Sequence, residues 1–132
     1  MIAVDTNVLL RLLVSDHEEQ TEQARRLFDD ARGNEPVYVG LIVLVEMVWA
    51  LRSRYGYDGE RIDAVVDGLL RTADIHVEAA TEVSSILADE AQGTRVLADA
   101  LIALAARQAG CTTTYTFDRR AARDVPGMTL LT

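Results

Sequence analysis

The stretch Met1-Ile2-Ala3-Val4-Asp5-Thr6-Asn7 decides the fold that this sequence predicts. A short apolar run with two β-branched residues is followed directly by an acid, a hydroxyl and an amide, and then by the apolar stretch 8–13. This pattern is typical of a buried strand that ends at a carboxylate. In an open parallel sheet, ligands bind beyond the carboxyl ends of the strands. We therefore expect Asp5 to lie at a functional site.

Beyond this strand, helices and strands alternate along the chain. Apolar residues at helical spacing predict helices over 7–13, 18–31, 41–54, 62–70, 79–91 and 95–109, with a short one after Asp118. Short β-prone runs predict further strands at 37–39, 75–77, 112–116 and 128–131. This alternation predicts an α/β fold with a parallel sheet sandwiched by helices, in one domain over residues 1–132.

Helix boundaries and burial follow from particular residues. Ser15-Asp16 is expected to cap the second helix, the segment 55–59 to cap the fourth, and Thr94 to cap the helix that begins near residue 95. The helix over 41–54 is apolar on all sides apart from Glu46. We therefore expect it to be buried all round, between the sheet and another helix or subunit.

Composition limits the function classes. With 132 residues, 49% apolar and 26% charged, the chain predicts a soluble globular protein without a membrane span or signal peptide, and a cytoplasmic location. Its net charge of -8 argues against non-specific duplex binding through a broad positive face. The single cysteine, Cys111, excludes an internal disulfide and is expected to be a small core residue.

Four acids occupy notable positions in the sequence, and helix capping explains only two of them. Asp5 and Asp118 each precede a helix, so each has a simple explanation as a helix cap. Glu46 and Asp99 are each expected inside an apolar helix, beyond the capping positions, where a carboxylate needs a cation or hydrogen-bond donors. A structural arginine is the alternative partner for these two, and the candidates are Arg11, Arg52, Arg95 and Arg107.

One metal site would explain all four acids, because Mg²⁺ and Mn²⁺ prefer oxygen ligands. The chain has no lysine, which argues against receiver domains and phosphotransferases of the haloacid dehalogenase type. It also has no Gly-rich phosphate loop ending in Gly-Lys-Ser/Thr, and its two histidines do not form a Ser/His/Asp arrangement.

The motifs around these acids resemble those of PIN-domain ribonucleases. The matching segments, in order, are Val4-Asp5-Thr6-Asn7, Leu44-Val45-Glu46, Ala98-Asp99-Ala100-Leu101-Ile102-Ala103 and Thr116-Phe117-Asp118-Arg119. The resemblance covers the whole chain, and its single-domain length is similar to that of VapC-type toxins of toxin–antitoxin pairs. It implies a three-layer sandwich with a central five-stranded parallel sheet flanked by helices.

The resemblance also implies a function and its residues. Asp5, Glu46, Asp99 and Asp118 become the catalytic, metal-binding acids, with Thr6, Asn7 and Thr116 as supporting polar groups. The implied cofactor is Mg²⁺ or Mn²⁺, the implied reaction is RNA hydrolysis, and the implied partners are a cognate antitoxin and a second copy of the chain. Arg119, Arg120 and Arg123 are candidates for contacts with the RNA backbone; the alternative is a solvated helix face.

Two departures from the family pattern bear on these roles. Many relatives carry a further acid where this chain has Val96, and a Ser or Thr at the start of the third helix, where this chain has Gly40-Leu41. The first departure weakens the hold on a second metal ion, while glycine can still occupy a helix cap. Two other functions remain open: a PIN ribonuclease in RNA processing without an antitoxin, and a catalytically silent protein-binding module.

Overall fold

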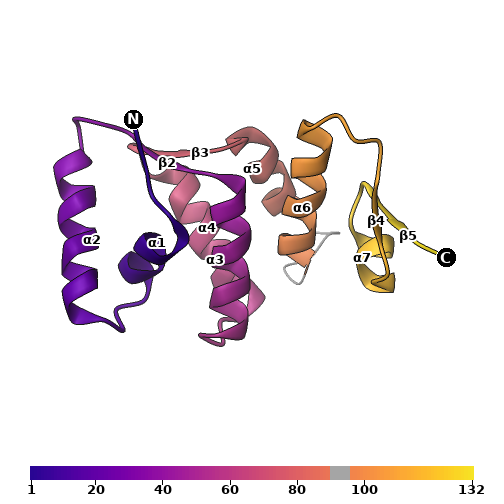
Figure 1. Cartoon of the computed structure of the whole chain (residues 1–132), viewed down its shortest axis with the longest axis horizontal. Helices are drawn as coiled ribbons and strands as arrows, with labels where there is room; N and C mark the ends of the chain where they lie inside the picture. The colour runs from indigo at the N-terminus through magenta and orange to yellow at the C-terminus, as the bar shows by residue number, and fades with distance from the viewer. Residues whose placement is uncertain (90–95) are drawn as a thin grey trace.

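The computed structural model describes residues 1–89 and 96–132 and has an α/β architecture (Figure 1). Its strands are β1 (Ile2–Ala3), β2 (Val37–Val39), β3 (Ile75–Val77), β4 (Thr114–Thr116) and β5 (Met128–Leu130). Its helices are α1 (Thr6–Leu13), α2 (Glu18–Ala31), α3 (Leu41–Ser53), α4 (Gly59–Arg71), α5 (Ala80–Ala88), α6 (Leu97–Gln108) and α7 (Arg119–Asp124).

Helix positions agree closely with those predicted from apolar spacing. The bounds of α2, β2 and β3 match the expected ranges, and those of α1 and α3 differ from them by one residue. The expected Thr94 cap and the helix start at residue 95 lie outside the described residues. The fifth helix was expected to reach residue 91, but α5 ends at Ala88. Local periodicity therefore predicted where the helices form.

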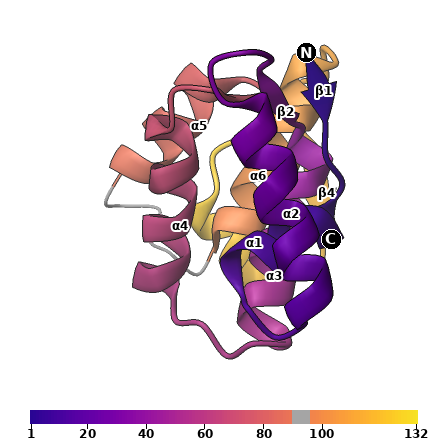
Figure 2. The ribbon, with the colours of Figure 1, turned by 90° about the vertical axis from the view of Figure 1, so that its left-hand side faces the viewer.

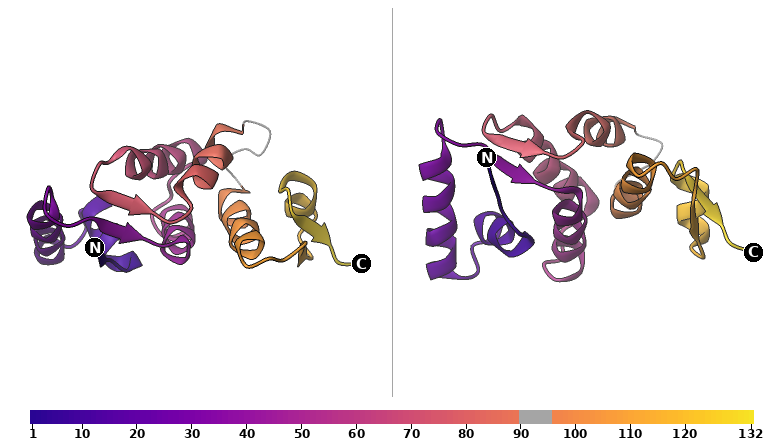
Figure 3. Two further views of the ribbon diagram at one scale, coloured as in Figure 1. Left: turned by 90° about the horizontal axis from the view of Figure 1, so that it is seen from above. Right: turned by 45° about the horizontal axis from the view of Figure 1, so that its top comes forward.

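A single five-stranded sheet, as the family resemblance implied, is not found among the described residues. β1, β2 and β3 form a three-stranded parallel sheet in that order, and β4 forms a separate parallel pair with β5. Figure 3 shows α6 standing between the two groups of strands. Because each strand has only two or three residues, its ladder contributes few hydrogen bonds, and packing against helices decides where a strand pair lies.

The core is divided by α6, which buries two of its faces. One face contributes Leu97, Leu101 and Leu104 to the main apolar cluster around β2 and α3. The other contributes Val96, Ala100 and Ala103 to a small cluster with Ala121 and Val125. The unit formed by β4, α7 and β5 therefore packs on the far side of α6, at the opposite end of the long axis from α2 (Figure 1).

The cap of α2 differs from the one expected. His17, not Ser15-Asp16, is the N-cap, and its Nδ1 accepts a hydrogen bond from the Gln20 backbone N–H at 3.1 Å. The expected cap of α4 is confirmed, since Asp58 accepts the Arg61 N–H at 2.9 Å. Short polar side chains before a helix predict that a cap exists, and the turn geometry selects which one serves.

At the start of α3, a residue distant in sequence supplies the acceptor that Gly40 lacks. The Leu41 backbone N–H donates to Glu78 Oε1 at 2.8 Å, from the segment that follows β3. Burial and the neighbouring Glu78 carboxylate together raise the pKa of Tyr38 above its usual value. The missing Ser or Thr at this position therefore has a replacement in the fold.

The expectation that α3 is buried on all sides is wrong for one face. Ile42 is 79% exposed and Trp49 is 64% exposed, and Glu46 lies between them on the same solvent-facing side. Figure 2, which looks at the molecule from the α2 end, shows α4 and α5 on one side and β1 on the other. In a helix that is apolar almost all round, periodicity does not show which face stays open.

Cys111 is exposed, so its assignment to the core is also wrong. The chain leaves α6 through Gly110, which has a positive φ of 90°, and then runs over the surface to β4. No helix among the described residues is long and apolar enough to cross a membrane.

Candidate active site

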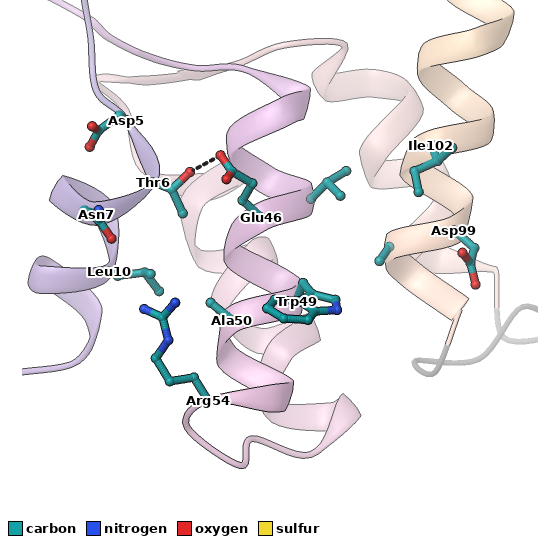
Figure 4. A pocket seen from close by; sticks show the side chains of 12 residues that line it. Asp5, Thr6, Asn7, Leu10, Glu46, Trp49, Ala50, Arg54, Asp99 and Ile102 are labelled. Carbon is teal, nitrogen blue, oxygen red and sulfur yellow. Dashed lines mark hydrogen bonds between the residues drawn. The ribbon is translucent and has the colours of Figure 1, made fainter.

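Three of the four acids line a single cleft. Asp5 from the end of β1, Glu46 from α3 and Asp99 from α6 border a cavity of about 540 Å³, together with Thr6 and Asn7 from the start of α1 (Figure 4). These elements are far apart in sequence, and α3 contacts both α1 and α6. The fold therefore brings most of the sequence-predicted site to one place.

Asp5 performs the capping role that the sequence allowed. Its Oδ1 accepts the Val8 backbone N–H at 3.1 Å and so begins α1 directly after β1. The side chain is exposed at the cleft. Within the described residues this hydrogen bond uses Oδ1, and Oδ2 is oriented by no further hydrogen bond, so it can bind another ligand. Capping and ligand binding are therefore compatible at this residue.

Glu46 is held by a neighbour from α1. The Thr6 hydroxyl donates a hydrogen bond to Glu46 Oε1 at 2.8 Å, which Figure 4 shows as a dashed line. The Glu46 side chain is exposed, so the burial cost expected for an acid inside an apolar helix does not arise. Thr6 fixes the position of a carboxylate that faces the cleft.

Asp99 lies in the first turn of α6 and not beyond the capping region, because the described helix begins at Leu97. Burial is the main reason why the pKa of Asp99 is raised above its usual value. The negative charge of Asp118 raises this pKa further, and the positive charge of Arg52 opposes the shift. The ion pairs formed within residues 1–89 and 96–132 do not include Asp99. The carboxylate of Asp118 therefore perturbs it more than the structural arginine does.

Asp118 stands apart from the cleft lining. Its Oδ1 caps α7 by accepting the backbone N–H groups of Arg120 at 2.9 Å and Ala121 at 3.1 Å. Its own N–H donates to Thr116 Oγ1 at 3.0 Å, so the supporting residue Thr116 orients the backbone there. Asp118 is nevertheless near enough to Asp99 for its charge to raise the pKa of Asp99.

The arginines after Asp118 are only partly available to a ligand. Arg123 is paired with Asp124 at 2.8 Å, and this hydrogen bond lowers the pKa of Asp124. Arg119 and Arg120 are exposed at the start of α7.

Among the cleft residues that were not predicted from the sequence, two have side chains that suit ligand binding. Trp49 and Arg54 line the cavity from α3, three and eight residues after Glu46. Helical geometry places residues three apart on one face, so the spacing from Glu46 could have indicated Trp49. Its position in an apolar run made it look like a core residue.

The donor set suits an oxygen-preferring cation. The cleft lining offers carboxylates, a hydroxyl and an amide, and it contains neither cysteine nor histidine. Within the described parts of the chain, however, no three acids, histidines or cysteines lie close enough together to hold a metal ion. The chemistry of the site fits Mg²⁺ or Mn²⁺, but in this structure the acids lie too far apart for three of them to bind one ion.

Short parallel strands, flanking helices and a carboxylate-lined cleft at the end of β1 define an α/β protein with an oxygen-donor site. The sequence profile of the PIN domain matches residues 2–127, and the chain belongs to the PIN domain family. PIN domains are in general nucleases that use a divalent metal ion. No significant match was found among curated proteins or among solved structures.

Proposed function

We propose that this protein is a Mg²⁺- or Mn²⁺-dependent endoribonuclease and the toxin of a type II toxin–antitoxin system. The observation that supports the nuclease part is the single cleft lined by Asp5, Glu46 and Asp99 from three separate elements. Carboxylates gathered at one surface repel one another unless a cation compensates them. Family membership supports the same chemistry.

The residues of the cleft have separate tasks in this proposal. A bound divalent ion would lower the pKa of a water molecule and neutralise charge on the phosphate. Asp5 and Glu46 would hold that ion, and Thr6 keeps the Glu46 carboxylate in place through its 2.8 Å hydrogen bond. Asp99 would complete the cleft from α6. Water-mediated hydrolysis would leave a 5′-phosphate and a 3′-hydroxyl.

Asp118 would join this set through a rearrangement of the C-terminal unit. β1 pairs only with β2, and β4 only with β5, in the part of the chain that the structure describes. If β4 took its place beside β1, the five-stranded sheet implied by the family resemblance would form. The acids at the ends of both strands would then approach each other.

Metal dependence is the first expected result. The purified protein should cut a structured RNA in Mg²⁺ or Mn²⁺ and should stop on chelation, because the cleft offers no histidine as a general base. The measurement is gel analysis of RNA incubated with the protein and either ion, with and without EDTA. Undiminished cutting in excess EDTA would exclude the mechanism, and absence of cutting under all conditions would favour a silent binding module.

We propose that a second copy of the chain covers the Ile42 end of α3. Ile42 is 79% exposed at the start of a helix whose other faces are buried. Light scattering at micromolar concentration should find a dimer, and Ile42→Asp should shift it to a monomer. A stable wild-type monomer at that concentration would contradict the proposal.

The proposed antitoxin would supply the opposite charge. The chain has a net charge of -8 and three carboxylates in its cleft. A basic or amphipathic segment could therefore place a cationic side chain against the acids and block the metal site.

A further inference from the structure

Trp49 occupies an unusual place for a large aromatic side chain. It is the single tryptophan of the chain and is 64% exposed. It lines the same cleft as Asp5, Glu46 and Asp99 (Figure 4). Its indole therefore presents apolar surface to water at the edge of the acid-lined cavity, where packing does not require it.

The geometry of α3 relates Trp49 to the proposed reaction centre. Trp49 follows Glu46 by three residues on the same face, which corresponds to about 4.5 Å along the helix axis. Ala98 and Ile102 of α6 form an apolar wall of the same cleft, and Ile102 is 43% exposed. The space beside the indole is therefore flat-sided and apolar, with carboxylates about one helical turn away.

A positive charge lies further along the same cleft. Arg54 follows Glu46 by eight residues, about 12 Å along the axis, and Figure 4 shows its side chain extending past Ala50 toward Leu10. The ion pairs within the described residues do not use Arg54. Its guanidinium is available to an anion at the cleft.

We propose that an unpaired RNA base stacks on the Trp49 indole while Arg54 binds a neighbouring phosphate, so that these two residues position the RNA beside the acids. This inference rests on the nuclease function proposed above and assigns two RNA-binding residues to the same cleft. Every base has a π face that an exposed aromatic ring can stack on, and arginine is well suited to phosphate. In a duplex the bases are already stacked on each other and cannot reach the indole.

A protein partner fits this part of the cleft less well than RNA. Glu46 lies between Ile42 and Trp49 on the exposed face of α3, so an apolar surface covering Trp49 would also remove the Glu46 carboxylate from water. RNA together with a divalent ion satisfies the carboxylates, the indole and the guanidinium at once. The proposed dimer contact is centred on Ile42, seven residues from Trp49 and about 10.5 Å along the helix.

The single tryptophan allows direct observation of the contact. In Mg²⁺, adding a ten-nucleotide single-stranded RNA should quench the intrinsic fluorescence of the protein as a base stacks on Trp49. A hairpin duplex of the same composition should not. Quenching that instead follows protein concentration in the absence of RNA, in step with dimer formation by light scattering, would show that a second copy covers Trp49 and would overturn the proposal.

Substitutions separate stacking from folding and from chemistry. Trp49→Leu should raise the Kd for labelled single-stranded RNA, measured by anisotropy, and the KM by about 5- to 150-fold, with kcat changed by about twofold or less. Trp49→Phe should retain most of the affinity. Arg54→Gln should weaken binding and reduce its salt dependence. The matched control is Tyr115→Leu, since Tyr115 is 63% exposed on β4 and outside the cleft lining.

The outcomes distinguish this inference from the proposed function. Cleavage by the wild type with unchanged KM and Kd in Trp49→Leu would overturn the stacking site and leave the nuclease standing. Quenching by single-stranded RNA without cleavage in any metal ion would support the stacking site and count against the nuclease. An equal effect of Tyr115→Leu would overturn the assignment of Trp49.

Discussion

Asp5→Asn is expected to lower RNA cleavage by about 100-fold or more, and to abolish any growth arrest caused by expression of the protein. The free energy of unfolding without metal should stay within about 0.5 kcal/mol of the wild type. Asparagine keeps the Oδ1 acceptor that holds the Val8 N–H at 3.1 Å, and it loses the charge that a divalent ion needs. RNA cleavage assays and urea unfolding in EDTA measure the two effects.

Two further variants complete this test. Asp5→Ala also removes the cap and should cost about 1 kcal/mol of stability in addition to activity. Asp58→Asn is the matched control, because Asp58 caps α4 in the same way, with the Arg61 N–H at 2.9 Å, and lies outside the cleft lining. Full RNA cleavage by a well-folded Asp5→Asn protein would show that Asp5 caps α1 and has no role in catalysis.

The helices were predictable because their determinants are local. α2 runs from Glu18 to Ala31 as expected, since its apolar positions repeat at helical spacing and the helix-breaking segment Gly33-Asn34-Glu35-Pro36 follows. Capping by Asp58 could be anticipated from the sequence for the same reason. The hydrogen bond between Glu78 and the start of α3 could not be anticipated, because Glu78 lies 37 residues after Leu41 in the chain.

The sheet was less predictable because strand neighbours are set by long-range packing. β4 and β5 form their own pair on the far side of α6, held by a small cluster around Ala100 and Ala121. Strands of two or three residues carry too little sequence to specify which edge they join. The family resemblance supplied a five-stranded sheet that periodicity alone did not require.

The placement of the candidate residues in one cleft was predicted in part, and the reasons differ between residues. Asp5, Glu46 and Asp99 share a cleft, as the hypothesis of one site for these acids requires. The reasoning for Glu46 was nevertheless wrong, since it assumed burial and the side chain is exposed. Trp49 was missed for the related reason that an almost wholly apolar helix does not reveal its open face.

Asp99→Asn should also lower RNA cleavage by about 100-fold or more, while the stability of the metal-free protein stays level or rises. Burial and the charge of Asp118 raise the pKa of Asp99, which means that the folded protein disfavours its ionised form. At neutral pH this carboxylate therefore costs stability, and an uncharged amide removes the cost. As the pH falls through the raised pKa, wild-type Asp99 becomes protonated, so the advantage of the variant should shrink.

The structural alternative for Asp99 predicts the opposite sign. If its main role were to pair with Arg52, then Asp99→Asn would lose that attraction, and because Arg52 is exposed the loss would be about 1 kcal/mol or less. Asp63→Asn is the matched control, since burial also raises the pKa of Asp63 and Arg52 also opposes that shift, yet Asp63 lies outside the cleft lining. Urea unfolding in EDTA and thermal melts with and without Mg²⁺ provide the measurements. Three results together would contradict the catalytic assignment of Asp99. In Asp99→Asn the Tm in EDTA would be lower than in the wild type, the Mg²⁺-dependent rise in Tm would be kept, and RNA would be cut at the rate of Asp63→Asn.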